Sequence, residues 1–420
     1  MNSNLFLQHR ELILSEMRQG SFAVFYSGSA PHKTQDQTYV YTPNRNFYYL
    51  TGLERENFTL VLLKGNEKTF TYLFIEEPSD YATKWLGRRL TKEEAATISG
   101  IEINSIKYVD QFNAFIYQQV LGNNRGALIA KPTTLYLDLY RFRPFIEPVS
   151  LTKSSFILKS YPEVVVASVN EIIDRHRMMK SKEEVDEIQT AISYSKQAIE
   201  AVMKHAKPGM NERELEAYYE YTLKSVGSKG VSFDSIIASG KNATVLHYID
   251  NNAEIHDDSL VLMDLGALSN NYASDISRTF PVNGKFTDRQ KVLYEIVLKA
   301  NKDSIAFVKP GITWQELNAY AKNILATECQ KIGLIKELSE IDKYYYHNVS
   351  HFLGLDVHDV GMYLEPLVPG LVLTIEPGLY VEEEGIGIRI EDNVLVTENG
   401  RINLSESILK EVSDIENLKK

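Results

Sequence analysis

The sequence predicts an α/β domain at the N-terminus, followed by an α+β domain whose two halves repeat each other. Two observations carry this prediction. In residues 1–160, short apolar runs typical of strands alternate with helical stretches. Further along, the segments KPGMNERELEAYYEY and KPGITWQELNAYAKN begin at Lys207 and Lys309 and share one pattern. We place the boundary near Tyr161-Pro162, so that the domains cover residues 1–165 and 166–420.

The N-terminal domain contains five runs that we interpret as strands: FAVFYSG, FTLVLL, TFTYLFI, GALIA and SLTKSSFILK. A helical stretch at residues 91–98 lies among them. Such alternation is typical of an α/β sheet domain. No cluster of metal-ligand residue types is visible in this part of the sequence.

The repeat in the second domain predicts two helix–helix junctions. Each copy reads Lys-Pro-Gly, an apolar residue and then a cap, which is Asn211 or Thr313. Glu214 or Glu316 follows three residues later, as in a capping box. One helix therefore ends at Pro-Gly and the next begins at the cap.

A long amphipathic helix is predicted before each copy, over residues 181–206 and 287–308. The first of them has an apolar face formed by Val185, Ile188, Ile192, Ile199 and Val202. Pro-Gly between helices is common by itself. The shared order of helix, Pro-Gly, helix and acidic hairpin favours an internal duplication, whose halves would bring their acids together at a pseudo-twofold axis.

The first acidic hairpin carries Asp264 and Asp275. Two apolar runs flank the turn-forming Ser269-Asn270-Asn271. Both aspartates are equidistant from the Ser269–Asn270 bond, so we expect them to be direct cross-strand neighbours, about 5 Å apart at Cβ. A turn centred one residue further along would shift the register and break this pairing.

The second acidic hairpin carries Glu376, in LVLTIEPGLY, and Glu391, in GIGIRIEDNVLV. These glutamates are equidistant from the Glu383–Glu384 bond, and Gly385 is available for the turn. Four clustered carboxylates repel one another unless a cation offsets their charge. Two divalent ions would do so, and two-metal hydrolases hold their ions about 3.5–4 Å apart. The alternative is that all four are surface acids, which the apolar character of both hairpins disfavours.

A histidine ligand is available in HNVSHFLGLDVHDVG. His347, His351 and His358 fall in this segment, although the whole chain has only nine histidines. Spacing alone does not choose among the three. Oxygen ligands with one imidazole favour Mn, Co, Fe or Zn.

Composition limits the remaining choices. The chain has 420 residues, 44% of them hydrophobic and 24% charged, with a net charge of −11. This charge argues against nucleic acid or anionic membranes as partners. We expect no membrane span and no signal peptide. Cys329 is the one cysteine, which excludes a disulfide within the chain and fits a reducing cytoplasm; we expect it to be a buried apolar residue.

Several ordered segments resemble the Xaa-Pro aminopeptidase (aminopeptidase P) family, in the proline-peptidase branch of the methionine-aminopeptidase and creatinase superfamily, whose catalytic domain has the "pita-bread" fold. They are MKSKEEVDEI, LVLMDLG, SDISRTFPVNGKFT, HNVSHFLGLDVHDVG, TIEPGLY and GIGIRIED, spanning roughly residues 175–400. NRNFYYLTG and KWLGRRL are similar to the family's creatinase-like N-terminal cap domain. Asn348 departs from the pattern, because relatives usually have a small residue there, and this puts the shape of the pocket in question.

The resemblance implies a dinuclear centre, usually with Mn(2+). Asp264 would chelate one ion. His351 and Glu376 would hold the other, while Asp275 and Glu391 would bridge both. A bridging hydroxide would attack the carbonyl of the first residue of the peptide, because two cations depress the pKa of the water between them.

The resemblance also assigns the surrounding residues. His247 and His358 would contact the substrate and stabilise the oxyanion, and Glu376 would transfer a proton. The proline side of the pocket would be lined by His347, Tyr380 and Arg389. Without the family, His247 in ATVLHYID has a competing interpretation as an ordinary polar loop residue.

By resemblance, the chain is a cytoplasmic metallo-aminopeptidase that removes the first residue from peptides with proline second. Proline lacks an N–H and its ring fixes φ, so a shaped pocket recognises it. Such enzymes form homodimers or homotetramers in which a neighbouring cap domain helps to close the site. Trp85 and Arg88 resemble that contribution, although they equally suit the core and surface of the cap domain.

Four other functions are open. A prolidase, restricted to Xaa-Pro dipeptides, shares the ligands and the two-domain plan, and it is the main alternative. A methionine aminopeptidase normally lacks the long N-terminal domain. Creatinase-like enzymes work without metals, and inactive binding proteins of this fold have usually lost ligands; the intact ligand set disfavours both.

Overall fold

The computed structural model describes residues 2–122 and 124–418, and the chain divides into two compact units, Met1–His176 and Arg177–Lys420. We call them unit 1 and unit 2. This division falls after the boundary expected between residues 165 and 166. Strand β8 (Val165–Ser168) crosses that position and pairs with β7 (Thr134–Leu137) in the sheet of unit 1.

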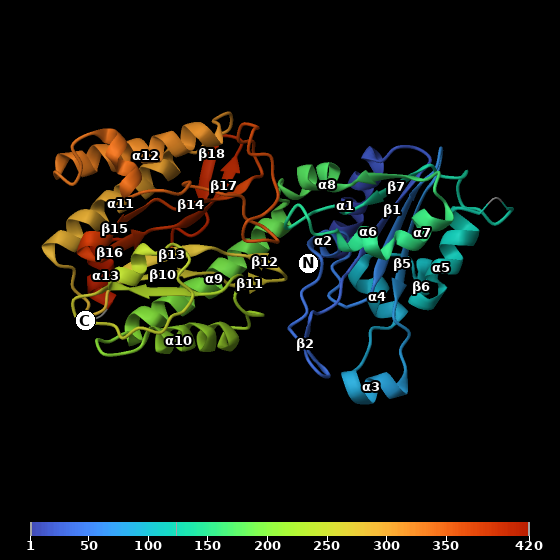
Figure 1. Ribbon diagram of the computed structural model, residues 1–420, viewed down its shortest axis with the longest axis horizontal. Helices are drawn as coiled ribbons and strands as arrows, with labels where there is room; N and C mark the ends of the chain where they lie inside the picture. The colour runs from blue at the N-terminus through green and yellow to red at the C-terminus, as the bar shows by residue number, and fades with distance from the viewer. Residues whose placement is uncertain (1, 123, 419–420) are drawn as a thin grey trace. The chain divides into compact units, whose positions relative to one another are not determined.

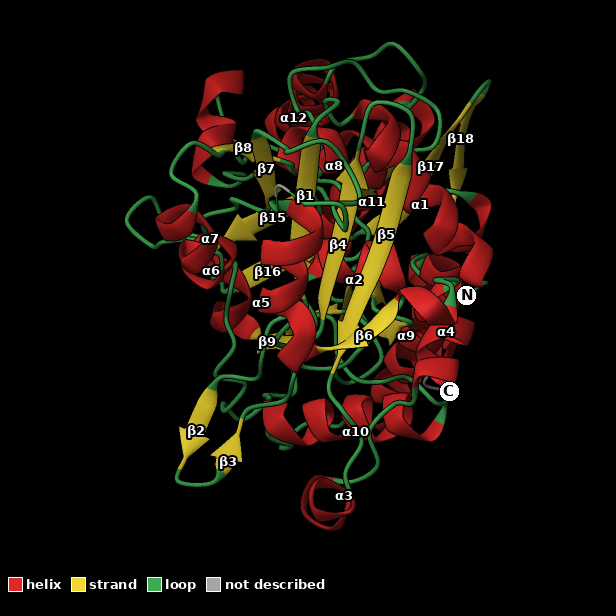
Figure 2. Ribbon diagram, turned by 90° about the vertical axis from the view of Figure 1, so that its right-hand side faces the viewer, coloured by secondary structure: helices red, strands yellow, loops and turns green. Residues whose placement is uncertain are grey.

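Unit 1 is an α/β domain built on a mixed six-stranded sheet in the order β6-β5-β4-β1-β7-β8. Figure 2 shows β1, β4 and β5 side by side, in agreement with their antiparallel ladders. The other strands of this sheet are β1 (Ser21–Tyr26), β4 (Thr59–Lys64), β5 (Thr69–Ile75) and β6 (Ile106–Tyr108). A separate hairpin joins β2 (His32–Thr34) to β3 (Gln37–Thr38).

Helices alternate with the strands of unit 1 along the chain. They are α1 (Ser3–Glu16), α2 (Arg45–Thr51), α3 (Asp80–Leu86), α4 (Lys92–Ser99), α5 (Phe112–Phe115), α6 (Val149–Lys153), α7 (Ser155–Ser160) and α8 (Asn170–Arg177). Phe22 and Val24 of β1 pack with Phe112 and Phe115 in one apolar core. The predicted helix at residues 91–98 is confirmed as α4, which Thr91 caps.

Two of the predicted strands of unit 1 are wrong. GALIA, at residues 126–130, is irregular, and the strand follows it as β7. SLTKSSFILK forms α6 and α7 instead. Ser150, Ser154 and Ile157 are the buried positions there, and their spacing of three or four residues is helical.

Unit 2 contains the repeated helix pairs that the sequence predicts. The first pair is α9 (Lys182–His205) and α10 (Glu212–Ser225), and the second is α11 (Asp288–Phe307) and α12 (Trp314–Lys331). Each pair packs together, and the strands lie between the two pairs in Figure 1. Asn211 and Thr313 form the expected capping boxes. Gly209 and Gly311 have φ of 83° and 90°, which favours glycine at the breaks.

The strands of unit 2 form two three-stranded sheets, β13-β10-β9 and β14-β17-β18, and two hairpins, β11-β12 and β15-β16. In chain order they are β9 (Ile236–Ser239), β10 (Leu260–Leu265), β11 (Leu268–Ser269), β12 (Tyr272–Ala273), β13 (Ile276–Pro281), β14 (Val372–Ile375), β15 (Gly378–Val381), β16 (Ile386–Arg389), β17 (Asp392–Thr397) and β18 (Gly400–Asn403). Helix α13 (Val412–Leu418) follows. An apolar core between α11, α12, β14 and β17 includes Leu317, Ala321, Leu373, Ile375 and Val394.

The predicted register holds in the second acidic hairpin. Ile375 pairs with Asp392, and Gly378 pairs with Arg389. Glu376 and Glu391 therefore face each other at the break between the two ladders. Gly385 has φ of 63° in the turn, as expected.

The predicted register of the first acidic hairpin is wrong. Asp264 pairs with Ser277, because the turn is centred on Asn270 and Asn271. Both asparagines have positive φ, which such a turn requires and which asparagine tolerates better than serine. Asp275 lies two positions along from Ser277 and so remains on the same face as Asp264.

Two further expectations can be compared with the structure. Cys329 is buried, as expected, and its burial raises the thiol pKa to about 12. Among the described residues, no helix combines the length and the apolar character needed to cross a bilayer.

Candidate metal centre and substrate cavity

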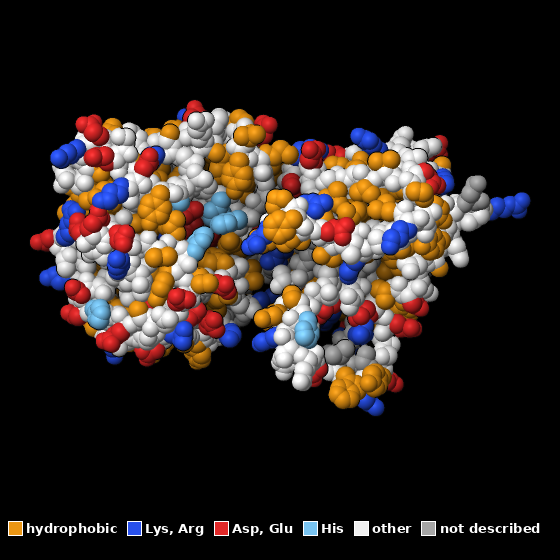
Figure 3. All heavy atoms as spheres, in the orientation of Figure 1, with side chains coloured by type: hydrophobic (Ala, Val, Ile, Leu, Met, Phe, Trp, Pro, Cys, Tyr) orange, Lys and Arg blue, Asp and Glu red, His pale blue; other side chains and the backbone are white. Residues whose placement is uncertain are grey.

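The five predicted metal ligands line one cavity of about 310 Å³ in unit 2. The other predicted residues that line it are His247, His347, His358 and Arg389. In Figure 3 the histidine side chains gather around a hollow in unit 2, where acidic atoms are visible. The sequence prediction therefore brought together residues that are up to 144 positions apart, from His247 to Glu391.

Strand ends place the carboxylates. Asp264 lies near the end of β10, and Asp275 immediately precedes β13. Glu376 follows β14, and Glu391 immediately precedes β17. Because all four lie at ends of neighbouring ladders, the backbone is fixed by hydrogen bonds on at least one side of each ligand.

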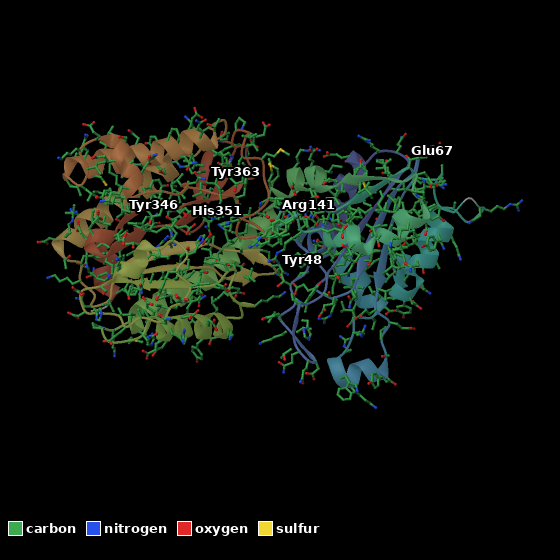
Figure 4. The ribbon with its side chains drawn as sticks, in the orientation of Figure 1. Tyr48, Glu67, Arg141, Tyr346, His351 and Tyr363 are labelled. Carbon is green, nitrogen blue, oxygen red and sulfur yellow. The ribbon has the colours of Figure 1, made fainter. Side chains whose placement is uncertain are left out.

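The backbone carbonyl of the next residue orients His351 toward the carboxylates. Its Nδ1 lies 3.0 Å from the carbonyl oxygen of Phe352. A carbonyl only accepts, so Nδ1 carries a proton, and Nε2 is directed at the acids. Nε2 is 3.3 Å from Oδ2 of Asp275 and 3.6 Å from Oε1 of Glu376. Figure 4 shows His351 in unit 2, to the right of Tyr346 and below Tyr363 in this view.

Two buried carboxylate oxygens have no hydrogen-bond partner among the described residues: Oδ1 of Asp275 and Oε1 of Glu391. Ligand atoms of Asp275, His351 and Glu391 also lie within 4.8 Å of one another. Leaving a buried acceptor unsatisfied is costly. A divalent cation would satisfy both oxygens, so the residues present fit a metal centre.

The pKa values of the carboxyls reflect the crowding of negative charge. Burial raises the pKa of Asp275 to about 6 and that of Glu376 to about 7, and neighbouring carboxylates add to both shifts. Burial and Asp275 raise the pKa of Glu391 well above its usual range. Burial alone would raise the pKa of Asp264, but the charge of Arg389 and the hydrogen bonds from Arg389 and Ser277 together lower that pKa. The cluster thus retains protons until a cation replaces them.

Arg389 connects the ligands to the predicted proline side of the cavity. Its Nη2 donates to Oδ2 of Asp264 at 2.6 Å, and its Nε donates to Oγ of Ser277 at 2.8 Å. Its Nη1 donates to the hydroxyl of Tyr380 at 3.0 Å, and that hydroxyl lies 2.8 Å from Nε2 of His347. Tyr380 is not among the residues that line the cavity, so it supports Arg389 and His347 from behind.

The predicted oxyanion residues lie at the cavity wall. The His358 ring lies 4.2 Å from the His351 ring, centroid to centroid. Burial and the neighbouring His351 lower the pKa of His358 to about 4, so its imidazole is neutral near pH 7. Burial and Arg389 likewise lower the pKa of His347 to about 4. His247 completes this group of cavity histidines.

The sequence did not single out several other site residues. Leu246, Ser350 and Tyr363 line the cavity. Asn348, which the sequence did mark as a departure from the family pattern, lines it too. Ser277 Oγ lies 2.8 Å from Oε2 of Glu391 and 3.0 Å from Oδ1 of Asp264. Ser277 lies two residues after Asp275, and alternate residues of a strand point to the same face, so this spacing could have predicted its place in the site. Tyr363, in an irregular segment, carries no such signal.

Trp85 and Arg88 belong to unit 1. Trp85, in α3, is 74% exposed. Arg88 donates two hydrogen bonds to the carboxylate of Glu94, at 2.8 and 2.7 Å. Arg88 is therefore engaged within unit 1, whereas the Trp85 ring is available on its surface.

Residues 186–398 match metallopeptidase family M24, and residues 6–128 match the aminopeptidase P N-terminal domain. The chain belongs to metallopeptidase family M24. An Xaa-Pro aminopeptidase of Escherichia coli K12 is 32% identical to it, over 98% of this chain and 97% of that protein. Human Xaa-Pro aminopeptidase 3 is 30% identical, over 94% of this chain and 80% of that protein.

Solved structures agree with this M24 assignment. The E. coli aminopeptidase P with the inhibitor Pro-Leu has a TM-score of 0.90 and 31% identity, covering 100% of this chain and 98% of that one. A Bacillus anthracis chain whose structure is assigned to aminopeptidase P has a TM-score of 0.94 and 45% identity, with the same coverage. The predicted pita-bread fold and hydrolase class are confirmed: this chain is a metal-dependent aminopeptidase, and the prolidase alternative is not favoured.

Proposed function

We propose that this M24 chain removes the first residue from peptides that carry proline at the second position. The observation that carries the proposal is the single cavity in which all five metal-ligand residues meet His247, His347, His358 and Arg389. Similarity to proteins named Xaa-Pro aminopeptidase over nearly the whole chain supports it. The substrate is a peptide, and neither nucleic acid nor membrane is a partner in this proposal.

The proposed centre holds two divalent ions, with Mn(2+) as the physiological metal. Asp264 would hold one ion, His351 and Glu376 the other, and Asp275 and Glu391 both. The two unsatisfied buried oxygens, on Asp275 and Glu391, support the bridging roles. When bound, the ions supply Lewis acidity, which lowers the pKa of water and polarises a carbonyl. One similar E. coli structure is zinc-substituted, so the choice of metal is open to test.

The protein's own groups would position the substrate and move protons. Glu376 would transfer a proton, since its carboxylate lies at the cavity beside His351. His247 and His358 would donate to the substrate carbonyl oxygen as negative charge develops there. The acidic cavity suits the free ammonium group of the peptide.

The proline pocket in this proposal is formed by His347 and Arg389, with Tyr380 behind them. A prolidase needs a cation for the free carboxylate of proline. Arg389 is the cavity's guanidinium, and its three nitrogens already donate to Asp264, Ser277 and Tyr380. This engagement supports a pocket that admits chain beyond proline.

We also propose that unit 1 acts as a cap domain, that the enzyme is cytoplasmic and that it forms a homodimer or homotetramer. The exposed ring of Trp85 supports a role in which it helps to close the cavity of a neighbouring copy of the chain. Arg88, which is hydrogen-bonded to Glu94, would lie beside it in that role.

Product analysis tests this function. Metal-loaded protein is incubated with an Xaa-Pro-Yaa peptide and with its N-acetylated form, and the products are identified by mass spectrometry. We expect free Xaa and Pro-Yaa from the first peptide and no cleavage of the second. Cleavage of the acetylated peptide would contradict an aminopeptidase.

A further inference from the structure

One buried asparagine donates hydrogen bonds to the backbone on both arms of the hairpin that carries the glutamate ligands. Asn301 of α11 is fully buried, and its Nδ2 donates to the carbonyl oxygens of Ile375 and Ile390, each at 3.1 Å. Ile375 immediately precedes Glu376, and Ile390 immediately precedes Glu391. One amide group thus joins the two backbone segments from which these ligands project.

The joint lies where the strand ladder is interrupted. The pairs of β14 with β17 end at Ile375 and Asp392, and those of β15 with β16 begin at Gly378 and Arg389. Between them, the only remaining cross-hairpin backbone bond among the described residues is a long one, 3.3 Å, from Ile390 N to Pro377 O. Asn301 supplies hydrogen bonds where the hairpin has fewest of its own.

The orientation of Asn301 is set by a buried lysine. Lys410 Nζ donates to Oδ1 of Asn301 at 2.9 Å and to Oδ2 of Asp392 at 2.5 Å. Lys410 has no acceptor atoms, so it selects the amide oxygen and directs both N–H groups at the two carbonyls. Lys410 comes from the segment after β18, beyond the strands that flank the ligands.

Arg278 ties the same network to Glu391. It is fully buried, and it donates to the carbonyl oxygen of Glu391 at 2.5 Å and to Oδ1 of Asp392 at 2.9 Å. It also donates to the carbonyl oxygens of Ile408 and Leu409, next to Lys410. The network therefore encloses the backbone on both sides of Glu391.

We propose that Asn301, oriented by Lys410, is a positioning residue that sets the distance between Glu376 and Glu391 and thereby the affinity of the metal centre. Asn301 and Lys410 do not line the cavity, so neither of them touches substrate. Residues that orient ligands in this way usually affect metal affinity by about 10- to 100-fold. The inference rests on the proposed two-metal function.

The test is a calorimetric titration of Mn(2+) into the metal-free full-length chain, without substrate. For Asn301→Ala we expect the weaker ion to bind about 10- to 100-fold less tightly than in the wild type. For Lys410→Met we expect a smaller loss in the same direction, because the amide keeps its place but loses its orienting donor.

Two matched controls separate positioning from general stability. Ser304→Ala removes a buried hydroxyl of α11 that has no hydrogen-bond partner among the described residues. Lys302→Met removes an exposed ion pair between α11 and Glu411, next in sequence to Lys410. Both controls should bind Mn(2+) as the wild type does. The thermal midpoint of each metal-free variant is measured alongside.

A lowered midpoint with wild-type Mn(2+) affinity in Asn301→Ala would overturn the inference, because it would show a purely structural role. If Asn301→Ala does not fold, the Mn(2+) affinity of Lys410→Met is compared with that of Lys302→Met. Equal affinities of these two variants would then overturn the inference. A wild-type chain that binds two ions but does not cleave Xaa-Pro peptides would refute the proposed function and leave this inference intact. A wild-type chain that binds no ion would refute both.

Discussion

The guanidinium of Arg389 lies against the carboxylate of Asp264, with 2.6 Å between Nη2 and Oδ2. Both side chains are largely buried, at 5% and 14% exposed. In the metal-free protein this arginine offsets the charge of one ligand, while Glu376 and Glu391 rely on protonation. Removing one partner of a buried ion pair leaves the other charge buried without compensation. This typically lowers the free energy of unfolding by about 3–5 kcal/mol.

Arg389→Met should therefore destabilise the metal-free protein by about 3 kcal/mol in urea unfolding. Added Mn(2+) should recover part of this loss, because the cation then compensates Asp264. Arg289→Met is the control, since its pair with Glu384 is 40% and 32% exposed and should contribute less than about 1 kcal/mol. Equal destabilisation of Arg389→Met with and without Mn(2+) would argue against this role.

Metal content should be two divalent ions per chain. Four clustered carboxylates cannot all stay ionised at close range without compensating charge. Two divalent ions supply about four positive charges, one for each carboxylate. Elemental analysis of the active enzyme measures this number, and a chelator should abolish activity, with Mn(2+) restoring it best. Full activity in protein without bound metal would refute the proposed centre.

Glu391→Gln keeps the shape of a bridging ligand and removes its charge. The second ion should then bind more weakly, and the turnover number should fall on the order of 10²-fold or more, the scale of catalytic electrostatic effects. Glu382→Gln, in the exposed turn of the same hairpin, should retain wild-type turnover. Normal turnover and two ions in Glu391→Gln would show that Glu391 is not a ligand.

Metal binding should release protons and should strengthen as pH rises from about 5.5 to 7.5. Burial raises the pKa of Asp275 to about 6 and that of Glu376 to about 7, so both carboxyls hold protons that a cation must displace. A raised folded-state pKa also means that the stability these groups contribute to the metal-free protein is present below their unfolded pKa and lost as pH rises through about 6 to 7. Calorimetry in buffers of different ionisation enthalpy counts the protons. Affinity that falls with rising pH would contradict the assignment.

Local signals made much of unit 2 predictable. Asn211 and Thr313 are each followed three residues later by glutamate, and this capping pattern predicts the start of a helix. The structure has a helix start at both positions. Glu376 and Glu391 were paired correctly because Gly385 fixes their turn. The expected partner of Asp264 was wrong by two residues, Asp275 instead of Ser277, because the turn is centred one residue further along. Two asparagines, rather than serine and asparagine, take the positive φ angles of this turn.

Long-range contacts were not predictable in the same way. Nothing near Lys410 in sequence indicates that its ammonium group reaches Asn301, 109 residues away. Tyr380 was expected at the cavity wall, but it lies behind that wall, where its hydroxyl is hydrogen-bonded to Arg389 and His347. Such positions depend on how separate elements pack, and no local pattern encodes that packing.

The central claim is cleavage after the first residue when proline is second, with chain allowed beyond it. Its most direct test compares the rates at which metal-loaded enzyme cleaves matched Xaa-Pro-Yaa, Xaa-Pro and Xaa-Ala-Yaa peptides. We predict that Xaa-Pro-Yaa is cleaved at least as fast as Xaa-Pro and that Xaa-Ala-Yaa is a poor substrate. Cleavage confined to the Xaa-Pro dipeptide, or equal cleavage of the alanine peptide, would contradict it.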